Sequence, residues 1–181
     1  MKLAILRIGS VNADIIHDIK RQLSEIFPKT VCTILEGEIP TPKDDYDSKR
    51  NQFHSSSILA KIHKYAEKVM ADRVLGITDV DLYVLHLNFV FGEAECPGKV
   101  ALISLYRLKP EFYGQPPDDT VFVERSVKEA VHEIGHTLGL GHCGDPLCVM
   151  FFSNSVLDTD RKKSSFCERC CSLVVKCVSV V

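Results

Sequence analysis

Three histidines and a glutamate occupy residues 132–142, which read HEIGHTLGLGH. His132 and His136 are four residues apart, so on an α-helix their rings lie on one face, where both can bind one small cation. Glu133 follows the first of these ligands and lies to its side, within reach of a water molecule at the cation. This spacing predicts a zinc site that carries out hydrolysis.

Gly139 and His142 complete the predicted site. Glycine readily takes a positive φ, so we expect Gly139 to end the helix three residues after His136 and to turn the chain sharply. The turn would bring His142 back as a third ligand. Three protein ligands leave one corner of a tetrahedral zinc ion for water, which is typical of a catalytic site and not of a closed structural one.

The motif extends beyond the histidines. The run follows HExxHxxGxxHCxxxxCxM and ends in a later CxxC, which adds Cys143, Cys148, Met150, Cys167 and Cys170. It resembles the archaemetzincins, a family of metzincin zinc metalloproteases. The close resemblance covers residues 128–170, and a weaker one covers RLKPEFYG at residues 107–114.

The resemblance implies a zinc metallopeptidase, a hydrolase whose substrate is a peptide or protein. His132, His136 and His142 would hold the catalytic zinc, and Glu133 would act as the general base when water attacks a peptide bond. Met150 falls where the family has a Met-turn, a tight bend whose thioether packs beneath the zinc ligands. We therefore interpret Met150, with Gly139, as structural support and not as a ligand.

Four of the eight cysteines form a second candidate metal set. Cys143 and Cys148 flank a short loop, and Cys167 and Cys170 are three residues apart. Four thiolates predict a closed, structural zinc site, so we expect two zinc ions per chain, one catalytic and one structural.

The remaining cysteines are interpreted from their neighbours. Ser165 and Glu168 fit a capping box, which would place the last two cysteine ligands in the first turn of a helix. Cys171 is an alternative to Cys170 as a ligand, although the family pattern favours Cys170. The cysteines in apolar stretches are predicted to be buried small hydrophobic side chains, and they are Cys32, Cys96 and Cys177.

Composition indicates one globular domain over residues 1–181, since 45% of the residues are hydrophobic and 25% are charged. A net charge of −2 does not favour nucleic-acid binding, and the apolar runs are too short for a membrane span. Arg7 interrupts the apolar start of the chain, so we predict a strand there and not a signal peptide. We expect a cytoplasmic monomer.

Strands and helices alternate along the chain. Periodicity predicts strands at 2–9, 31–36, 81–87, 88–96 and 99–106, and helices at 12–27 and 55–74. The 81–87 strand is expected at the centre of the sheet, and residues 39–53 and 110–119 are expected to be loops. The active-site helix is predicted to start at Asp119 or Thr120; a start at Ser126, which forms a capping box with Glu129, is the alternative.

This order predicts an α/β fold and resembles the metzincins. The resemblance implies a mixed twisted sheet with an antiparallel edge strand at 88–96 and an active-site helix. It also implies a division into an N-terminal subdomain, residues 1–139, and a small zinc-stapled C-terminal subdomain, residues 140–181. The helix at 55–74 would be an insertion. An extended peptide could pair with the exposed edge strand above the zinc.

Two other functions remain open. The chain could be a catalytically weak or silent zinc-binding interaction module, which the retained Glu133 argues against. It could instead be a zinc aminopeptidase or amidase of narrow specificity, which would need a carboxylate to bind the free amine. Glu93 and Glu95 on the predicted edge strand are candidates for that role, although solvated strand charges explain them more simply.

Overall fold

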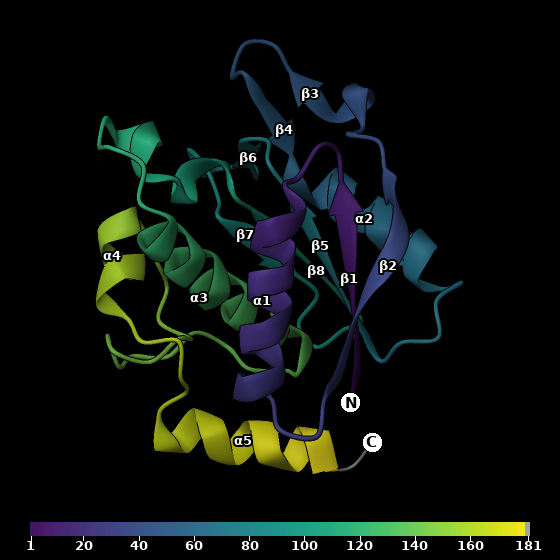
Figure 1. Cartoon of the computed structure of the whole chain (residues 1–181), viewed down its shortest axis with the longest axis vertical. Coiled ribbons are helices and arrows are strands. Elements are labelled where there is room, and N and C mark those ends of the chain that lie inside the picture. Colours follow the sequence, from purple (N-terminus) through teal and green to yellow (C-terminus); the bar gives the residue numbers. More distant parts are fainter. Residues whose placement is uncertain (180–181) are drawn as a thin grey trace.

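A five-stranded mixed sheet forms the centre of the computed structural model, which describes residues 1–179 and the side chains of residues 1–175 (Figure 1). In spatial order the strands are β2 (Val31–Ile39), β1 (Lys2–Ile8), β5 (Arg73–Thr78), β8 (Val100–Ser104) and β7 (Gly92–Ala94). The first four are parallel, and β7 runs antiparallel to β8 at the edge. The predicted α/β class with an antiparallel edge strand is therefore confirmed, but β7 is shorter than the predicted strand at 88–96.

Helices cover both faces of this sheet (Figure 1). The long helices α1 (Ala13–Ile26) and α3 (Asp119–Thr137) pack on one face, and α2 (Ser55–Ala66) packs on the other. Every residue of β8 is buried, because a parallel strand with helices on both sides has no solvent-exposed face. Two apolar cores result, and α3 is fixed between the larger core and the edge strand.

Both long helices begin close to their predicted starts. The side chain of Asn12 accepts a hydrogen bond from the Asp14 N–H, and α1 follows directly. Asp118 caps α3 by accepting from the Val121 N–H, which confirms the earlier of the two predicted starts. The alternative start at Ser126 is wrong, since Ser126 is buried within α3 and donates to the Phe122 carbonyl.

Two predictions between residues 55 and 87 are wrong. Helix α2 ends at Ala66, not at residue 74, and the central strand is β5, not residues 81–87. Val74 fits the apolar period of the helix, but in the fold it pairs in β5 between β1 and β8. A short apolar run cannot be assigned to a helix or a strand by its period alone, and tertiary pairing decides here.

The predicted loop at residues 39–53 contains regular structure, so that prediction is wrong in part. It holds a 3-10 turn, η1 (Lys43–Asp45), and the short strands β3 (Tyr46–Asp47) and β4 (Gln52–His54). These strands form a small sheet with β6 (Leu82–Tyr83), which is what the structure retains of the expected 81–87 strand. Polar strands of two or three residues give no periodic signal in the sequence.

The segment before α3 contains two further 3-10 turns, η2 (Tyr106–Leu108) and η3 (Pro110–Tyr113). After α3 the chain forms α4 (Val156–Arg161), which the sequence analysis missed, and α5 (Glu168–Ser179). Ser155 and Asp158 form the capping box of α4. The expected capping box at Ser165 is wrong, because α5 begins at Glu168 and the Cys171 N–H donates to the Cys167 carbonyl.

Helix α5 crosses below the ends of α1 and α3 (Figure 1). The division into subdomains at residue 139 stays a prediction. No helix in the described range is both long enough and apolar enough to cross a membrane.

Candidate active site

The three histidines of the motif converge. His132 and His136 project from the same face of α3, and their Nε2 atoms lie 3.1 Å apart. One nitrogen from each of these rings and from His142 lies within 4.8 Å of the others. Tetrahedral zinc with bonds of roughly 2.0–2.1 Å separates its ligands by about 3.3–3.4 Å, so this donor set fits one zinc ion.

Two backbone carbonyls orient the histidines on α3. His132 Nδ1 donates to the Val149 carbonyl at 2.8 Å, and His136 Nδ1 donates to the Leu140 carbonyl at 2.7 Å. With the proton held on Nδ1, each ring presents the lone pair of Nε2 to the shared centre. Burial lowers the pKa of all three histidines, most strongly that of His132, and so favours the neutral form that binds metal.

The turn after α3 has the predicted geometry. Gly139 has a φ of +88°, and its N–H donates to the His136 carbonyl at 2.8 Å. The chain then reverses and presents His142 beside the α3 histidines. His142 is exposed, and its ring lies 4.8 Å from the Phe152 ring, measured between centroids, so the two rings pack against each other.

Met150 is fully buried beneath the α3 histidines. A side chain at Gly135, between His132 and His136 on α3, would overlap the Met150 thioether. The carbonyl that orients His132 belongs to the preceding residue, Val149. The structural role of Met150 stays a prediction, which this buried position supports.

Glu133 lines a cleft of about 270 Å³ together with the three histidines. The opposite wall is the edge strand β7 and the residues that precede it, and Phe152 lies on the C-terminal side. Burial, followed by the nearby Glu129 carboxylate, raises the pKa of Glu133 well above its ordinary value. A bound cation would favour the charged form, so this buried carboxylate is suited to exchange a proton at the metal site.

Gly92 on β7 leaves the space that Glu133 occupies. A Cβ at this position would lie 2.6 Å from Glu133 Cγ and 2.7 Å from the Leu102 carbonyl oxygen. We expect Gly92→Ala to lower kcat/KM by roughly 10- to 100-fold, because it displaces the Glu133 carboxylate by a fraction of an ångström or more. Steady-state peptide cleavage measures the effect.

Gly144→Ala is the matched control for this prediction, because nothing lies within 4 Å of a Cβ at Gly144. The control should cleave at the parental rate. Parental kcat/KM in Gly92→Ala would show that the approach of β7 to Glu133 has no catalytic importance.

The carboxylates of Glu93 and Glu95 already have partners. Glu93 accepts hydrogen bonds from the hydroxyls of Ser55 and Ser56 at the start of α2, the second at 2.7 Å. Glu95 accepts from the Lys99 N–H at 2.8 Å and pairs with His63. Burial by itself raises the pKa of Glu95, but these hydrogen bonds lower it overall. The interpretation of both residues as solvated strand charges is therefore wrong.

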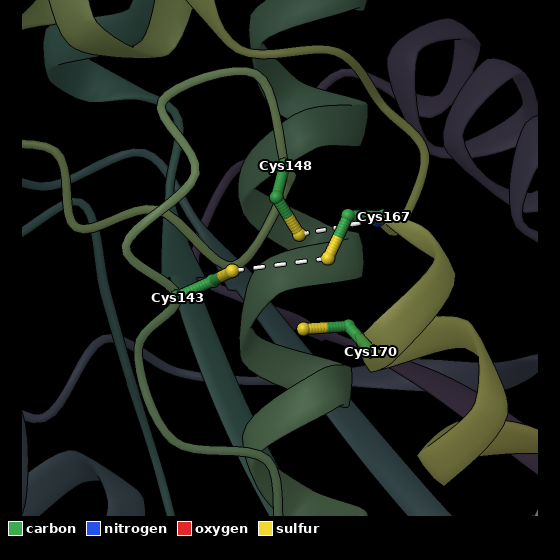
Figure 2. A group of neighbouring side chains, drawn as sticks. All are labelled: Cys143, Cys148, Cys167 and Cys170. Atoms are coloured by element: carbon green, nitrogen blue, oxygen red, sulfur yellow. Dashed lines mark hydrogen bonds between the residues drawn. The ribbon is translucent and has the colours of Figure 1, made fainter.

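Four cysteines form the second cluster (Figure 2). Cys143 and Cys148 come from the loop after the histidines, and Cys167 and Cys170 come from the start of α5, with all four sulfurs pointing toward a common centre. The Sγ atoms of Cys143 and Cys167 lie 3.8 Å apart. Tetrahedral zinc with Zn–S bonds of about 2.3 Å gives the same separation, roughly 3.8 Å. The cluster therefore fits a zinc ion.

Backbone amides support the sulfurs of this cluster. The Cys167 N–H donates to Cys148 Sγ at 3.3 Å, and the Asp145 N–H donates to Cys143 Sγ at 3.5 Å. The Cys170 N–H lowers the pKa of Cys167, whereas burial raises the pKa of Cys148 and Cys170. Donors directed at sulfur favour thiolates, the form that binds metal.

The other cysteines lie apart from this cluster. Cys171 is exposed and outside it, while Cys170 is inside. Cys32 is buried, as predicted, and burial raises its pKa to about 11. The prediction that Cys96 is buried is wrong, since its side chain is exposed beside the turn to Pro97. Cys177 lies outside the residues whose side chains are described.

Several residues of the cleft were missed in the sequence. Gly92 and Phe152 are defined only by contacts between distant segments. Glu129, which also lines the cleft, was considered only as part of a helix cap. The sequence does indicate that Glu129 lies near the site: it precedes Glu133 by four residues, which places both carboxylates on one helix face.

Comparison with known proteins identifies the family of this chain. The sequence pattern of Peptidase family M54 matches residues 5–176. The archaemetzincin of Methanocaldococcus jannaschii is 48% identical over 170 residues, which are 94% of this chain and 90% of that protein. Both matches cover nearly the whole length of the chain.

Two solved structures have the same fold. The crystal structure of archaemetzincin from Methanopyrus kandleri has a TM-score of 0.86 and 37% identity, covering 99% of this chain and 96% of that one. A zinc-dependent peptidase from Methanocorpusculum labreanum also has a TM-score of 0.86, with 29% identity, covering 95% and 99%. The chain therefore belongs to peptidase family M54, the archaemetzincins, and is a zinc metallopeptidase.

Proposed function

We propose that this metallopeptidase holds its catalytic zinc with His132, His136 and His142 and uses Glu133 as general base. The observation that carries the proposal is the convergence of three imidazole nitrogens within 4.8 Å beside a buried carboxylate, Glu133, that has no ion pair among the described residues. The Nδ1 hydrogen bonds of His132 and His136 support it, because they fix which nitrogen faces the metal. Gly139 and Met150 would shape the site without binding the ion.

The substrate would be an extended peptide lying along β7. This strand is the outermost of the sheet and pairs on one side with β8, so its other side can form backbone hydrogen bonds to a peptide. The cleft between β7 and α3 places such a peptide over the histidines. Phe89 and Phe91 add an apolar wall for its side chains.

Zinc, when bound, supplies the Lewis acidity that activates water and polarises the peptide carbonyl. Glu133 would take the proton from the attacking water and return it to the leaving amine. The rigid α3 helix fixes the carboxylate relative to the histidines, and β7 fixes the peptide. The cleft walls limit the access of bulk water to this proton transfer.

The cysteine cluster would hold a second, structural zinc, giving two ions per chain. Its four sulfurs support this, since a complete set of protein ligands leaves no position for substrate. We also propose that the histidine cleft separates the N-terminal subdomain, residues 1–139, from the C-terminal one, residues 140–181. We further propose that the protein is a monomer that binds peptides and no nucleic acid. A cytoplasmic location fits the cysteine cluster, because thiolates that bind zinc persist in a reducing compartment.

The deciding experiment is incubation of the zinc-loaded protein with an unbiased peptide mixture, followed by mass spectrometry of the products. We expect internal cleavages that a zinc chelator abolishes and added zinc restores. Glu133→Gln serves as the inactive control. An intact mixture under all conditions would favour the catalytically silent interaction module.

The same experiment tests the aminopeptidase alternative when half of the mixture carries acetylated N-termini. An endopeptidase cuts both halves equally, whereas an aminopeptidase needs the free amine. The hydrogen bonds that Ser55 and Ser56 donate to Glu93 weaken the case for Glu93 as an amine anchor. Cleavage restricted to free N-termini would therefore contradict the proposed endopeptidase.

A further inference from the structure

A buried ion pair lies behind the proposed catalytic carboxylate. Lys162, just after α4, is 1% exposed, and its Nζ lies 3.0 Å from Glu129 Oε1. The Thr159 hydroxyl donates to the same Glu129 oxygen at 2.9 Å. In the described part of the chain, Glu129 is the only carboxylate at ion-pair distance from Lys162. A charged pair buried this deeply adds little net stability, so its presence calls for another reason.

The pair adjoins the active site through Glu129. Glu129 precedes Glu133 by four residues on α3, so both carboxylates lie on the same helix face, and both line the cleft. Burial lowers the pKa of His132, His136 and His142, and the positive charge of Lys162 lowers it further. The ammonium is therefore close enough to influence how the charges of the site are arranged.

Three carboxylates line the cleft in the described structure, and two of them have fixed partners. Glu93 accepts hydrogen bonds from Ser55 and Ser56, whereas Glu129 accepts one from Thr159 and lies at ion-pair distance from Lys162. Among these three, Glu133 alone has neither a hydrogen bond nor an ion pair. Of these three side chains, Glu133 is therefore the one whose carboxylate is free to act on a substrate.

We infer that Lys162 is a positioning residue for the peptidase reaction: by binding Glu129 it keeps Glu133 as the single free carboxylate beside the histidines. The inference rests on the proposed role of Glu133. Without the ammonium, the Glu129 carboxylate would be buried unpaired one helical turn from Glu133 and would repel it. Without Glu129, the ammonium would be left unpaired and would attract the Glu133 carboxylate, which lies within range of its charge.

The backbone around Lys162 is anchored independently of this pair. Arg125 on α3 binds Asp160 through two hydrogen bonds, at 2.6 and 2.7 Å. Lys128, also on α3, donates to the Asp160 carbonyl at 3.1 Å. Removal of the Lys162 charge should therefore leave α4 in place, and its effect can be measured in a folded protein.

A double-mutant cycle tests the inference, with Lys162→Met, Glu129→Gln and the double variant compared with the parent. We expect each single variant to lose kcat by roughly 10- to 100-fold, with a smaller change in KM. The double variant should regain most of this kcat, because neither charge is left without a partner. Zinc per chain and Tm are measured on all four proteins.

Lys128→Met is the matched control. Lys128 also has a buried stem at the contact of α3 with α4, but its ion pair is with Glu124, which does not line the cleft. The control should lower Tm and leave kcat close to that of the parent. It separates the loss of a buried lysine in this region from the loss of the charge that binds Glu129.

Recovery of Tm without recovery of kcat in the double variant would overturn the inference, since a purely structural pair behaves in this way. Parental kcat in Lys162→Met would also overturn it. If a single variant does not fold, the kcat of the double variant still distinguishes a positioning role from a purely structural role: a kcat near that of the parent supports positioning, and a low kcat contradicts it. Failure of the proposed function gives a different result, because Glu133→Gln then cleaves as the parent does whatever the cycle shows.

Discussion

Glu133→Gln should lower kcat by about 10²- to 10⁴-fold and leave the zinc content unchanged, since loss of a general base typically has this effect. The amide has the shape of the carboxylate but cannot accept the proton of the attacking water. Glu133 does not belong to the histidine cluster that would bind the metal, so its replacement should not release the ion. Peptide cleavage and elemental analysis of the purified variant measure the two quantities.

Glu124→Gln is the control for this variant. Glu124 lies on the same helix, but its side chain is 59% exposed and pairs with Lys128 away from the cleft. This control should retain parental kcat. His136→Ala provides the contrast, because it should lose the catalytic zinc together with activity. Cleavage by Glu133→Gln at the parental rate would show that another group takes the proton.

Cys148→Ser should release one of the two proposed zinc ions and strongly destabilise the C-terminal part of the fold. Cys148 is 1% exposed, and its sulfur joins the loop after the histidines to the start of α5. Zinc binding contributes directly to folding, by about 10–16 kcal/mol in zinc-finger peptides, so its loss is expected to lower Tm by many degrees. Elemental analysis and thermal unfolding measure both effects.

Activity should fall in the same variant. Val149 and Met150 directly follow Cys148, and the Val149 carbonyl orients His132. A loosened cysteine cluster should therefore disturb His132, a proposed zinc ligand, through the adjoining Val149 carbonyl.

Cys171→Ser is the matched control, because Cys171 neighbours the cluster in sequence but is exposed and outside it. It should keep the zinc content and Tm of the parent. If Cys148→Ser holds as much zinc as the parent, or if the parent holds one ion per chain, the structural zinc is disproved.

The sequence by itself was sufficient wherever the determinants are close together in the chain. His132 and His136 lie on one helix face because of the helical period, with Glu133 to the side of His132, and Gly139 ends that helix because of its backbone freedom. The CxxC spacing of Cys167 and Cys170 likewise brought two sulfurs together. Such local rules need no knowledge of the rest of the fold.

Only the tertiary structure decided how separate segments meet. The central strand is β5 and not residues 81–87, because pairing with β1 and β8 selects among apolar runs of similar pattern. The approach of Gly92 to Glu133 and the ion pair of Lys162 with Glu129 join residues more than thirty positions apart. Helical and strand periods describe one segment at a time, whereas these contacts depend on how whole elements pack, so no pattern in the chain predicts them.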